Sequence, residues 1–101
     1  MDTKTAFSTG SENGYSIAMS NQSEFVSLGA DEYLSMVLET ESDTFRQYSP
    51  FEFLASEFNK SNNSESLWDN YDKGVEAGAK KAIIELKKEF KEELSLKEEG
   101  E

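Results

Sequence analysis

The stretch that decides the fold is residues 68–86, WDNYDKGVEAGAKKAIIEL. Its apolar residues return at intervals of three and four, which places their side chains on one face of an α-helix. Extended in both directions, the same pattern predicts one long helix from Glu65 to about Leu96, roughly 48 Å at 1.5 Å per residue. So small a chain has little else to cover a helix of this length. We therefore expect one end to project or to pair with another copy.

Two shorter amphipathic helices are predicted before the long one. Ala30–Thr40 gathers its apolar residues on one face and carries two acidic residues in its first turn, where the helix dipole favours them. The next helix starts at Ser49-Pro50-Phe51-Glu52, which combines an N-cap serine, a proline at the first helical position and a glutamate three residues after the cap. Between them, Asp43–Tyr48 has room for a short turn of helix.

The N-terminal part is predicted to be a coil or a short β-hairpin. Asn13-Gly14 is a turn signal, because both residues tolerate a positive φ. After it, apolar and small polar residues alternate over residues 15–20, which is the pattern of a half-buried strand. Glu24–Leu28 is a second candidate strand. We expect a flexible tail over residues 1–12 and a single acidic helical domain over residues 13–101.

The fold class is therefore mainly α: two short amphipathic helices and one long C-terminal helix, preceded by the coil or hairpin. Large apolar residues of the three helices are expected to form the core. They are Leu34, Val37, Leu38, Phe51, Leu54, Phe58, Trp68, Tyr71, Val75, Ile83 and Leu86.

Composition excludes several classes of function. The chain of 101 residues has no cysteine and no histidine, so it lacks thiol chemistry, the commonest general base and the commonest transition-metal ligand. Carboxylate pairs are present, but no phosphate-binding loop or nucleophile motif accompanies them. No apolar run approaches the ~20 residues of a membrane span, and a signal pattern is lacking. We expect a cytoplasmic protein that is not an enzyme and holds no cofactor.

Asp69–Gly74 resembles the opening of a calcium loop only superficially. The third and fifth ligand positions would be Tyr71 and Lys73, and the twelfth would be Lys80 instead of glutamate. Because an ammonium group repels a cation, no metal site is predicted.

The carboxylates are unevenly distributed along the chain. Residues 1–79 hold 14 acidic and four basic residues, whereas residues 80–101 hold seven acidic and six basic residues. A concentrated negative charge attracts basic partners and repels nucleic acid and anionic membranes. We therefore expect a basic protein as partner, with no direct binding to nucleic acid. The candidate partner-binding residues are Asp31, Glu32, Glu39, Glu41, Asp43, Glu52, Glu57, Glu65, Asp69, Asp72 and Glu76.

The spacing of these carboxylates suits mimicry of DNA. Residues three or four apart on a helix lie about 5–6 Å from one another, and duplex DNA carries one charge per ~1.7 Å of its axis. Glu39, Glu41 and Asp43 also crowd the end of a helix, where the dipole disfavours negative charge. Solubility is the alternative explanation, since net charge keeps many small proteins dispersed.

A stripe of small residues runs along the predicted long helix, with Gly74, Gly78 and Ala82 at intervals of four. An interior glycine costs about 0.5–1 kcal/mol relative to alanine, and close approach of another helix offsets that cost. The stripe can serve self-association or docking of a partner helix. The alternatives are packing against the two shorter helices and a locally weak helix.

In size and charge, the chain resembles the small acidic inhibitors that phages and mobile elements use against restriction, CRISPR or repair proteins. The resemblance implies an anti-defence protein that occupies the basic groove of a nucleic-acid-binding protein or nuclease complex. The alternative function is a helical homodimeric structural or adaptor protein whose acidity serves only solubility.

Overall fold

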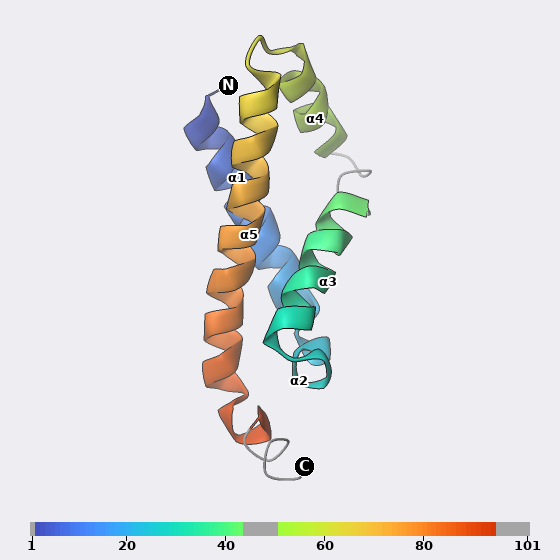
Figure 1. Ribbon diagram of the computed structural model, residues 1–101, viewed down its shortest axis with the longest axis vertical. Helices are drawn as coiled ribbons and strands as arrows, with labels where there is room; N and C mark the ends of the chain where they lie inside the picture. The colour runs from blue at the N-terminus through green and yellow to red at the C-terminus, as the bar shows by residue number, and fades with distance from the viewer. Residues whose placement is uncertain (1, 44–50, 95–101) are drawn as a thin grey trace.

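A computed structural model describes residues 2–43 and 51–94, apart from the side chains of residues 51–55. Every regular element in these residues is helical, which confirms the mainly α class. In chain order they are α1 (Thr3–Ser20), the 3₁₀ turn η1 (Gln22–Glu24), α2 (Phe25–Leu28), α3 (Ala30–Asp43), α4 (Phe51–Lys60) and α5 (Ser64–Glu89). The molecule is a rod of 53 × 22 × 17 Å, with α5 along its length (Figure 1).

The coil or hairpin predicted at the N-terminus is wrong, because residues 3–20 form the single helix α1. Its start is capped by Asp2, whose Oδ1 accepts a hydrogen bond of 2.7 Å from the backbone N–H of Thr5. Residues 3–12, where a flexible tail was expected, form the first half of α1, and Ala6 within them is fully buried.

Four glycines hold α1 and α5 in backbone contact. Each opposes a carbonyl group of the other helix: Gly10 opposes Tyr71, Gly14 opposes Val75, Gly74 opposes Phe7 and Gly78 opposes Ser11. A Cβ atom at any of the four would lie closer than 3.0 Å to that carbonyl oxygen, so only glycine fits. Because the paired residue numbers rise together, the two helices run parallel (Figure 1).

This contact explains why α1 is a helix. Its glycines disfavour an isolated helix by about 0.5–1 kcal/mol each. Close approach brings Cα–H groups against carbonyl oxygens, which contributes about 0.5–1 kcal/mol per contact. The stripe continues at the same four-residue interval to Ala6 and Ala18, and both are fully buried. Packing against α5 therefore overrides the local turn preference of Asn13-Gly14.

One core cluster lies where α2 and α3 meet the lower half of the α1–α5 pair. Phe25 is at its centre, and its ring centroid lies 5.3 Å from that of Tyr33 and 6.3 Å from that of Phe90. The Tyr33 hydroxyl donates a hydrogen bond to the carbonyl oxygen of Ala18, which ties α3 to α1. The chain enters α3 through Gly29, whose φ of 82° suits glycine.

A second cluster attaches α4 to the upper half of α5. The Phe58 ring is fully buried and packs edge-on against Trp68 at 5.0 Å and Tyr71 at 5.9 Å. Trp68 donates a hydrogen bond of 2.9 Å from its ring nitrogen to Asn59 at the end of α4. Aromatic contacts therefore hold α4 in place.

The predicted helices correspond to α3, α4 and α5. The Ser49-Pro50 cap and residues 44–48 lie outside the described residues. The predicted end near Leu96 lies outside the described residues, and residues 91–94 are helical. α5 itself ends at Glu89, because the chain turns at Phe90, whose ring packs on Phe25. Its length is about 39 Å at 1.5 Å per residue, and α1, α3 and α4 all pack against it.

The predicted core is confirmed in part. Val37, Phe58, Tyr71, Val75, Ile83 and Leu86 are buried. Leu34, Leu38 and Trp68 are partly buried, and the side chains of Phe51 and Leu54 lie outside the described residues. The core list missed Ala6, Ile17, Ala18, Phe25, Tyr33, Leu67, Ala79 and Ala82. Half of these lie before residue 26, in the part expected to be coil or hairpin.

Candidate acidic interaction surface

α3 is the most one-sidedly charged element of the structure. Its sequence, ADEYLSMVLETESD, contains five carboxylates and no basic residue. Tyr33 and Val37 bury one face of the helix against the core, which directs the remaining positions outward. Asp31, Glu32 and Glu39 are exposed. The amphipathic pattern of α3 therefore displays these three predicted partner-binding carboxylates on the surface.

The carboxylates at the C-terminal end of α3 do not share one environment. Asp43 is exposed, but Glu41 retains only 1% of its surface accessible. The inward direction of Glu41 follows from helical spacing, because it lies four residues after the buried Val37. Glu41 therefore offers a partner little surface.

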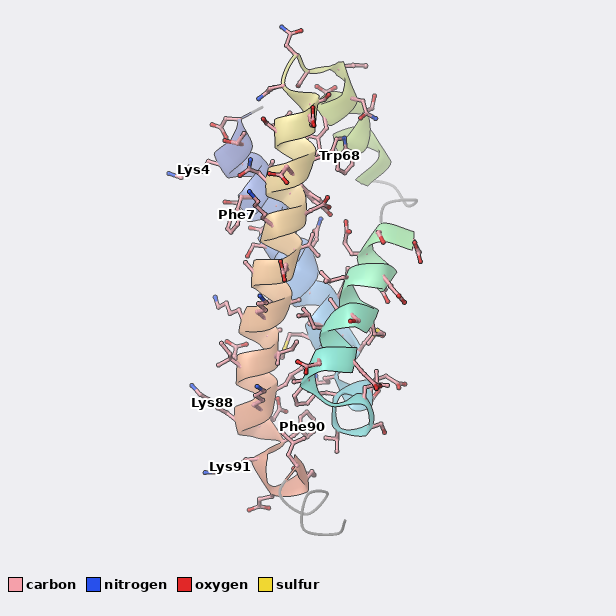
Figure 2. All side chains as sticks on the ribbon, viewed as in Figure 1. Lys4, Phe7, Trp68, Lys88, Phe90 and Lys91 are labelled. Atoms are coloured by element: carbon pink, nitrogen blue, oxygen red, sulfur yellow. The ribbon has the colours of Figure 1, made fainter. Side chains whose placement is uncertain are left out.

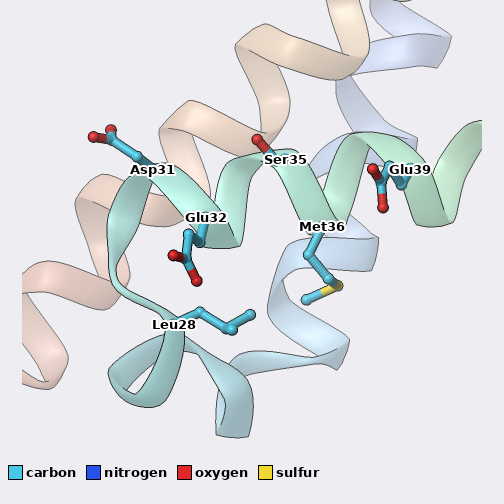
Figure 3. A pocket seen from close by; sticks show the side chains of 6 residues that line it. All are labelled: Leu28, Asp31, Glu32, Ser35, Met36 and Glu39. Carbon is cyan, nitrogen blue, oxygen red and sulfur yellow. The ribbon is translucent and has the colours of Figure 1, made fainter.

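A groove of about 370 Å³ lies between α2 and the outer face of α3. Its walls are Leu28, Asp31, Glu32, Ser35, Met36 and Glu39. Figure 3 shows Glu32 and Met36 extending from α3 toward Leu28, whereas Asp31 and Ser35 point to the opposite edge of the helix. The groove thus combines two apolar side chains with three of the exposed carboxylates of α3.

A second hollow of about 370 Å³ lies between the end of α3 and the middle of α5. It is lined by Leu38, Glu41, Ser42, Asp72, Val75 and Glu76. Residues that are 30 or more positions apart in the sequence meet there, because α3 packs along α5. This hollow brings predicted partner-binding residues of the two helices together.

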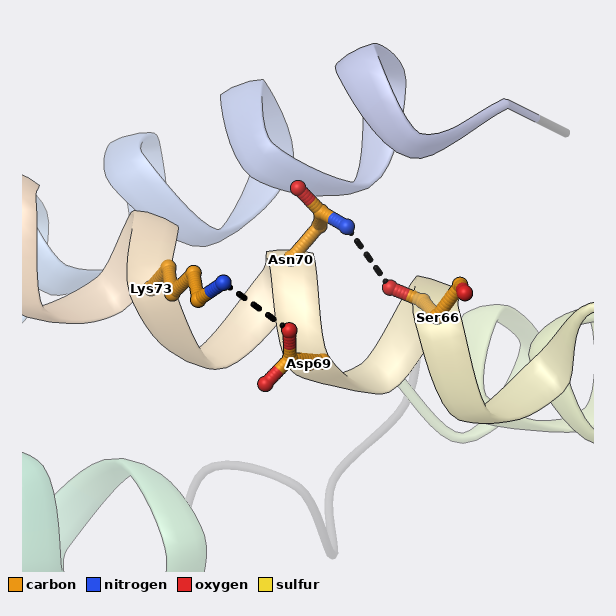
Figure 4. Close-up of polar contacts among 4 residues, drawn as sticks. All are labelled: Ser66, Asp69, Asn70 and Lys73. Carbon is orange, nitrogen blue, oxygen red and sulfur yellow. Dashed lines mark hydrogen bonds and ion pairs between the residues drawn. The ribbon is translucent and has the colours of Figure 1, made fainter.

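Two carboxylates of α5 are engaged by neighbouring lysines. The Lys73 ammonium nitrogen lies 3.0 Å from an oxygen of Asp69 (Figure 4), and that of Lys80 lies 3.2 Å from an oxygen of Glu76. Exposed pairs at this spacing contribute about 0.3–0.5 kcal/mol each. The predicted partner-binding residues Asp69, Asp72 and Glu76 are therefore interleaved with positive charge, unlike those of α3.

The remaining predicted partner-binding residues are dispersed. Glu57 is half-buried near the end of α4, and Glu65 is exposed in the first turn of α5. The side chain of Glu52 lies outside the described residues. Neither Glu57 nor Glu65 lines either groove.

Several lysines lie on the other side of the rod. Lys4, Lys88 and Lys91 extend from the outer side of α1 and α5, away from α3 (Figure 2). Also on α5, Glu85 accepts a hydrogen bond from the Tyr15 hydroxyl, and this bond raises the pKa of Tyr15. The Lys81 nitrogen lies 5.7 Å from the centroid of the Tyr15 ring. The molecule thus has an acidic side at α3 and a mixed side at α5.

The predicted self-association stripe is occupied within the chain. Gly74 and Gly78 are buried against α1, and Ala82 is buried in the same cluster as Ile17 and Ala18. Internal packing was one of the two interpretations of the stripe, although the neighbour is α1 rather than the two shorter helices. In this arrangement the stripe has no surface left for a second copy.

Within residues 2–43 and 51–94, no helix is long and apolar enough to cross a membrane. Among the same residues, no group of three or more acidic side chains is arranged to hold a metal ion. Comparison with protein-family models, curated proteins and solved structures gives no match for this chain. Its function is therefore argued from its own surface.

Two residues of the acidic surface were missed by sequence reasoning. Leu28 and Met36 are half-buried and line the α2–α3 groove between its carboxylates. Met36 lies outside the apolar stripe that was recognised in Ala30–Thr40, and Leu28 was assigned to a candidate strand. The sequence did contain a signal for this site. Met36 is an apolar residue on the polar side of the helix, beside Glu32 and Glu39.

Proposed function

We propose that this protein is a non-enzymatic inhibitor that binds a basic nucleic-acid-binding protein through the outer face of α3. The observation that carries the proposal is the absence of basic residues from α3, which presents Asp31, Glu32 and Glu39 to solvent. A surface whose charges all have one sign associates faster with a protein surface of the opposite charge. The inhibitor would occupy the groove that otherwise holds nucleic acid.

The distribution of charged residues favours α3 over α5 as the surface that contacts the partner. Carboxylates at positions 32 and 39 are separated by two helical turns, or about 10.5 Å. At about 1.7 Å of axis per charge, the same span of duplex DNA carries about six phosphate charges, or about three on each strand. On α5, by contrast, lysines pair with Asp69 and Glu76 and weaken the negative field there.

The whole-chain charge supports the same class of partner. The net charge of -11 disfavours direct contact with DNA or RNA, because phosphate binding needs clusters of Lys and Arg. Inhibitors of the phage and mobile-element type, which the chain resembles in size and charge, act on such proteins. Their targets are cytoplasmic, the compartment that the sequence predicts.

Affinity capture followed by competition tests this proposal. The immobilised protein is incubated with a bacterial lysate at low salt, and bound proteins are eluted with duplex DNA. We expect the eluted fraction to contain nucleic-acid-binding proteins, each of which loses its DNA when the free inhibitor is added. In gel shifts the inhibitor alone should leave DNA unshifted.

A matched pair of triple variants serves as the control. Asp31→Asn, Glu32→Gln and Glu39→Gln together remove three charges from α3. Glu12→Gln, Glu89→Gln and Glu93→Gln remove the same number from exposed positions elsewhere. Only the first triple should abolish capture. Capture of proteins that DNA does not displace would refute the proposal.

A further inference from the structure

The groove between α2 and α3 offers more than negative charge. Leu28 and Met36 both pack against the first core cluster and line the groove with their remaining surface. Gly29 makes this possible, because its φ of 82° turns the chain so that α2 folds back beside α3 (Figure 3). Two apolar side chains thus line the groove beside the carboxylates of α3.

Met36 contacts Thr40, one helical turn further along α3. The Thr40 hydroxyl lies 3.4 Å from the sulfur of Met36 and also donates a hydrogen bond of 2.8 Å to its backbone carbonyl oxygen. Methionine is unbranched and polarisable, so it adapts to side chains of different shape. The groove can therefore accept an aliphatic or aromatic side chain without a rigid template.

The volume of the groove limits its occupant. At about 370 Å³ it lies near the lower end of the range for small-molecule sites, and it is open to solvent. The groove has too few lining residues to enclose an extended cofactor. One or two side chains of another protein, presented by a helix, match this size and the usual helix-in-groove mode of recognition.

The charges around the groove define the rest of the occupant. Glu32 and Glu39 flank Met36 on α3, separated by about 10.5 Å along the helix axis. A partner helix with basic residues at positions i and i+7 has the same spacing, and a residue at i+3 or i+4 lies between them on the same face. Charge complementarity therefore selects a basic helix with an apolar residue at its centre.

We propose that the α2–α3 groove binds one apolar side chain of a basic helix in the partner, with Lys or Arg residues on either side facing Glu32 and Glu39. The proposal rests on the proposed function and specifies which part of the partner is contacted. It adds a hydrophobic anchor to an interaction that DNA mimicry alone would make purely electrostatic. Burial of that anchor slows dissociation, whereas the charges speed encounter.

Two synthetic helical peptides test the anchor. Both carry Lys at positions i and i+7 on an alanine-rich helix, and they differ at i+3, where one has Leu and the other Gln. Binding of each fluorescein-labelled peptide to the full chain is measured by fluorescence anisotropy at low salt. We expect the Leu peptide to bind about ten-fold more tightly, from burial of the Leu side chain.

Variants assign the effect to the groove. Met36→Gln should reduce the affinity of the Leu peptide to that of the Gln peptide and leave the Gln peptide unchanged. Ile84→Gln, at a 57% exposed position on α5, is the matched control and should change neither affinity. If Met36→Gln fails to fold, the difference between the two peptides on the unaltered chain still decides the question.

Each contrary result would overturn a different part of the proposal. Equal, salt-sensitive affinities for the two peptides would exclude the anchor and leave the electrostatic inhibitor intact. If neither peptide bound at low salt, the groove proposal and the attraction of α3 for basic helices would both fall. Sedimentation that showed dimers, lost in Met36→Gln, would assign the groove to a second copy and contradict a partner helix.

Discussion

The contact between α1 and α5 has no side-chain bulk and no charge at its centre, whereas the α2–α3 groove has three exposed carboxylates and two apolar side chains in its lining. In the first region four glycines bring backbones together, and a single added Cβ atom would clash. In the second, the carboxylate side chains face solvent, so we expect their substitution to leave the backbone undisturbed. One region is intolerant of any added atom, and the other tolerates changes of charge.

The difference separates stability from binding. Changes at the glycines should alter the free energy of unfolding, and changes on α3 should alter affinity for a partner. The two regions lie on different helices, and α3 reaches the α1–α5 pair through Tyr33 and Val37 on its inner face. Substitutions in each region can therefore be measured independently of the other.

The largest expected effect is at the glycine contact. Gly14→Ala and Gly78→Ala should each lower the free energy of unfolding by about 3 kcal/mol, because the new Cβ atom forces the helices apart. Urea unfolding followed by circular dichroism measures the change. Ser8→Ala, at an exposed position of α1, should have little effect. A gain of about 0.5–1 kcal/mol in the glycine variants, as helix propensity alone predicts, would show that α1 and α5 do not touch there.

A smaller effect is expected where α3 joins α1. Tyr33→Phe removes a buried hydroxyl that donates to the Ala18 carbonyl, and it should cost about 1 kcal/mol. Tyr15→Phe removes a hydroxyl that bonds to Glu85 at the surface, and its cost should be lower. The same urea experiment ranks the two variants, and the reverse order would contradict the buried position of Tyr33.

Alkaline pH gives a further test of the Tyr33 environment. Burial raises the pKa of Tyr33 above its ordinary value of 10.0, and the nearby charge of Glu24 adds to the shift. The folded state therefore favours the neutral phenol. Its contribution to stability is complete below pH 10 and is lost as the pH rises through the higher folded-state pKa. Tyr33→Phe should flatten this part of the stability profile, and an unchanged profile would contradict the assignment.

The smallest expected effects are those of single charges on α3. Glu32→Gln removes a carboxylate from the first turn and should lower stability by about 0.5 kcal/mol, because the helix dipole favours negative charge there. Glu39→Gln removes one toward the opposite end and should raise stability by ~0.3 kcal/mol. Thermal unfolding at low salt resolves the sign of the difference, which should shrink at high salt. Equal effects would mean that the dipole has no part in placing these charges.

The sequence predicted the helices whose buried residues are large and apolar. It did not predict α1, whose buried residues are mostly small. Phe58, Tyr71 and Val75 follow a helical period that can be recognised without a structure, and all are buried. In α1 the corresponding stripe is Ala6, Gly10, Gly14 and Ala18, residues that carry almost no hydrophobic signal. Asn13-Gly14 then favoured a turn, because local propensity cannot include a contact with residues 60 positions away.

The stripe in α1 nevertheless had a recognisable counterpart. Gly74, Gly78 and Ala82 recur every four residues, as the small residues of α1 do. Two stripes of equal period in one chain indicate that the helices pack on each other, and only the second stripe was recognised. The acidic surface was predicted more fully, since exposed carboxylates follow from composition, but the burial of Glu41 depended on the packing of α3 against the core.

The measurement that tests the central claim most directly is the salt dependence of binding to a captured partner. Affinity is measured from low to physiological salt for the unaltered chain, the α3 triple variant and the triple variant with charges removed at Glu12, Glu89 and Glu93. We predict that affinity falls steeply with salt for the unaltered chain and the second variant. For the α3 variant, affinity should be weak at low salt and should depend little on salt. Identical salt dependence in all three proteins would show that α3 is not the binding surface.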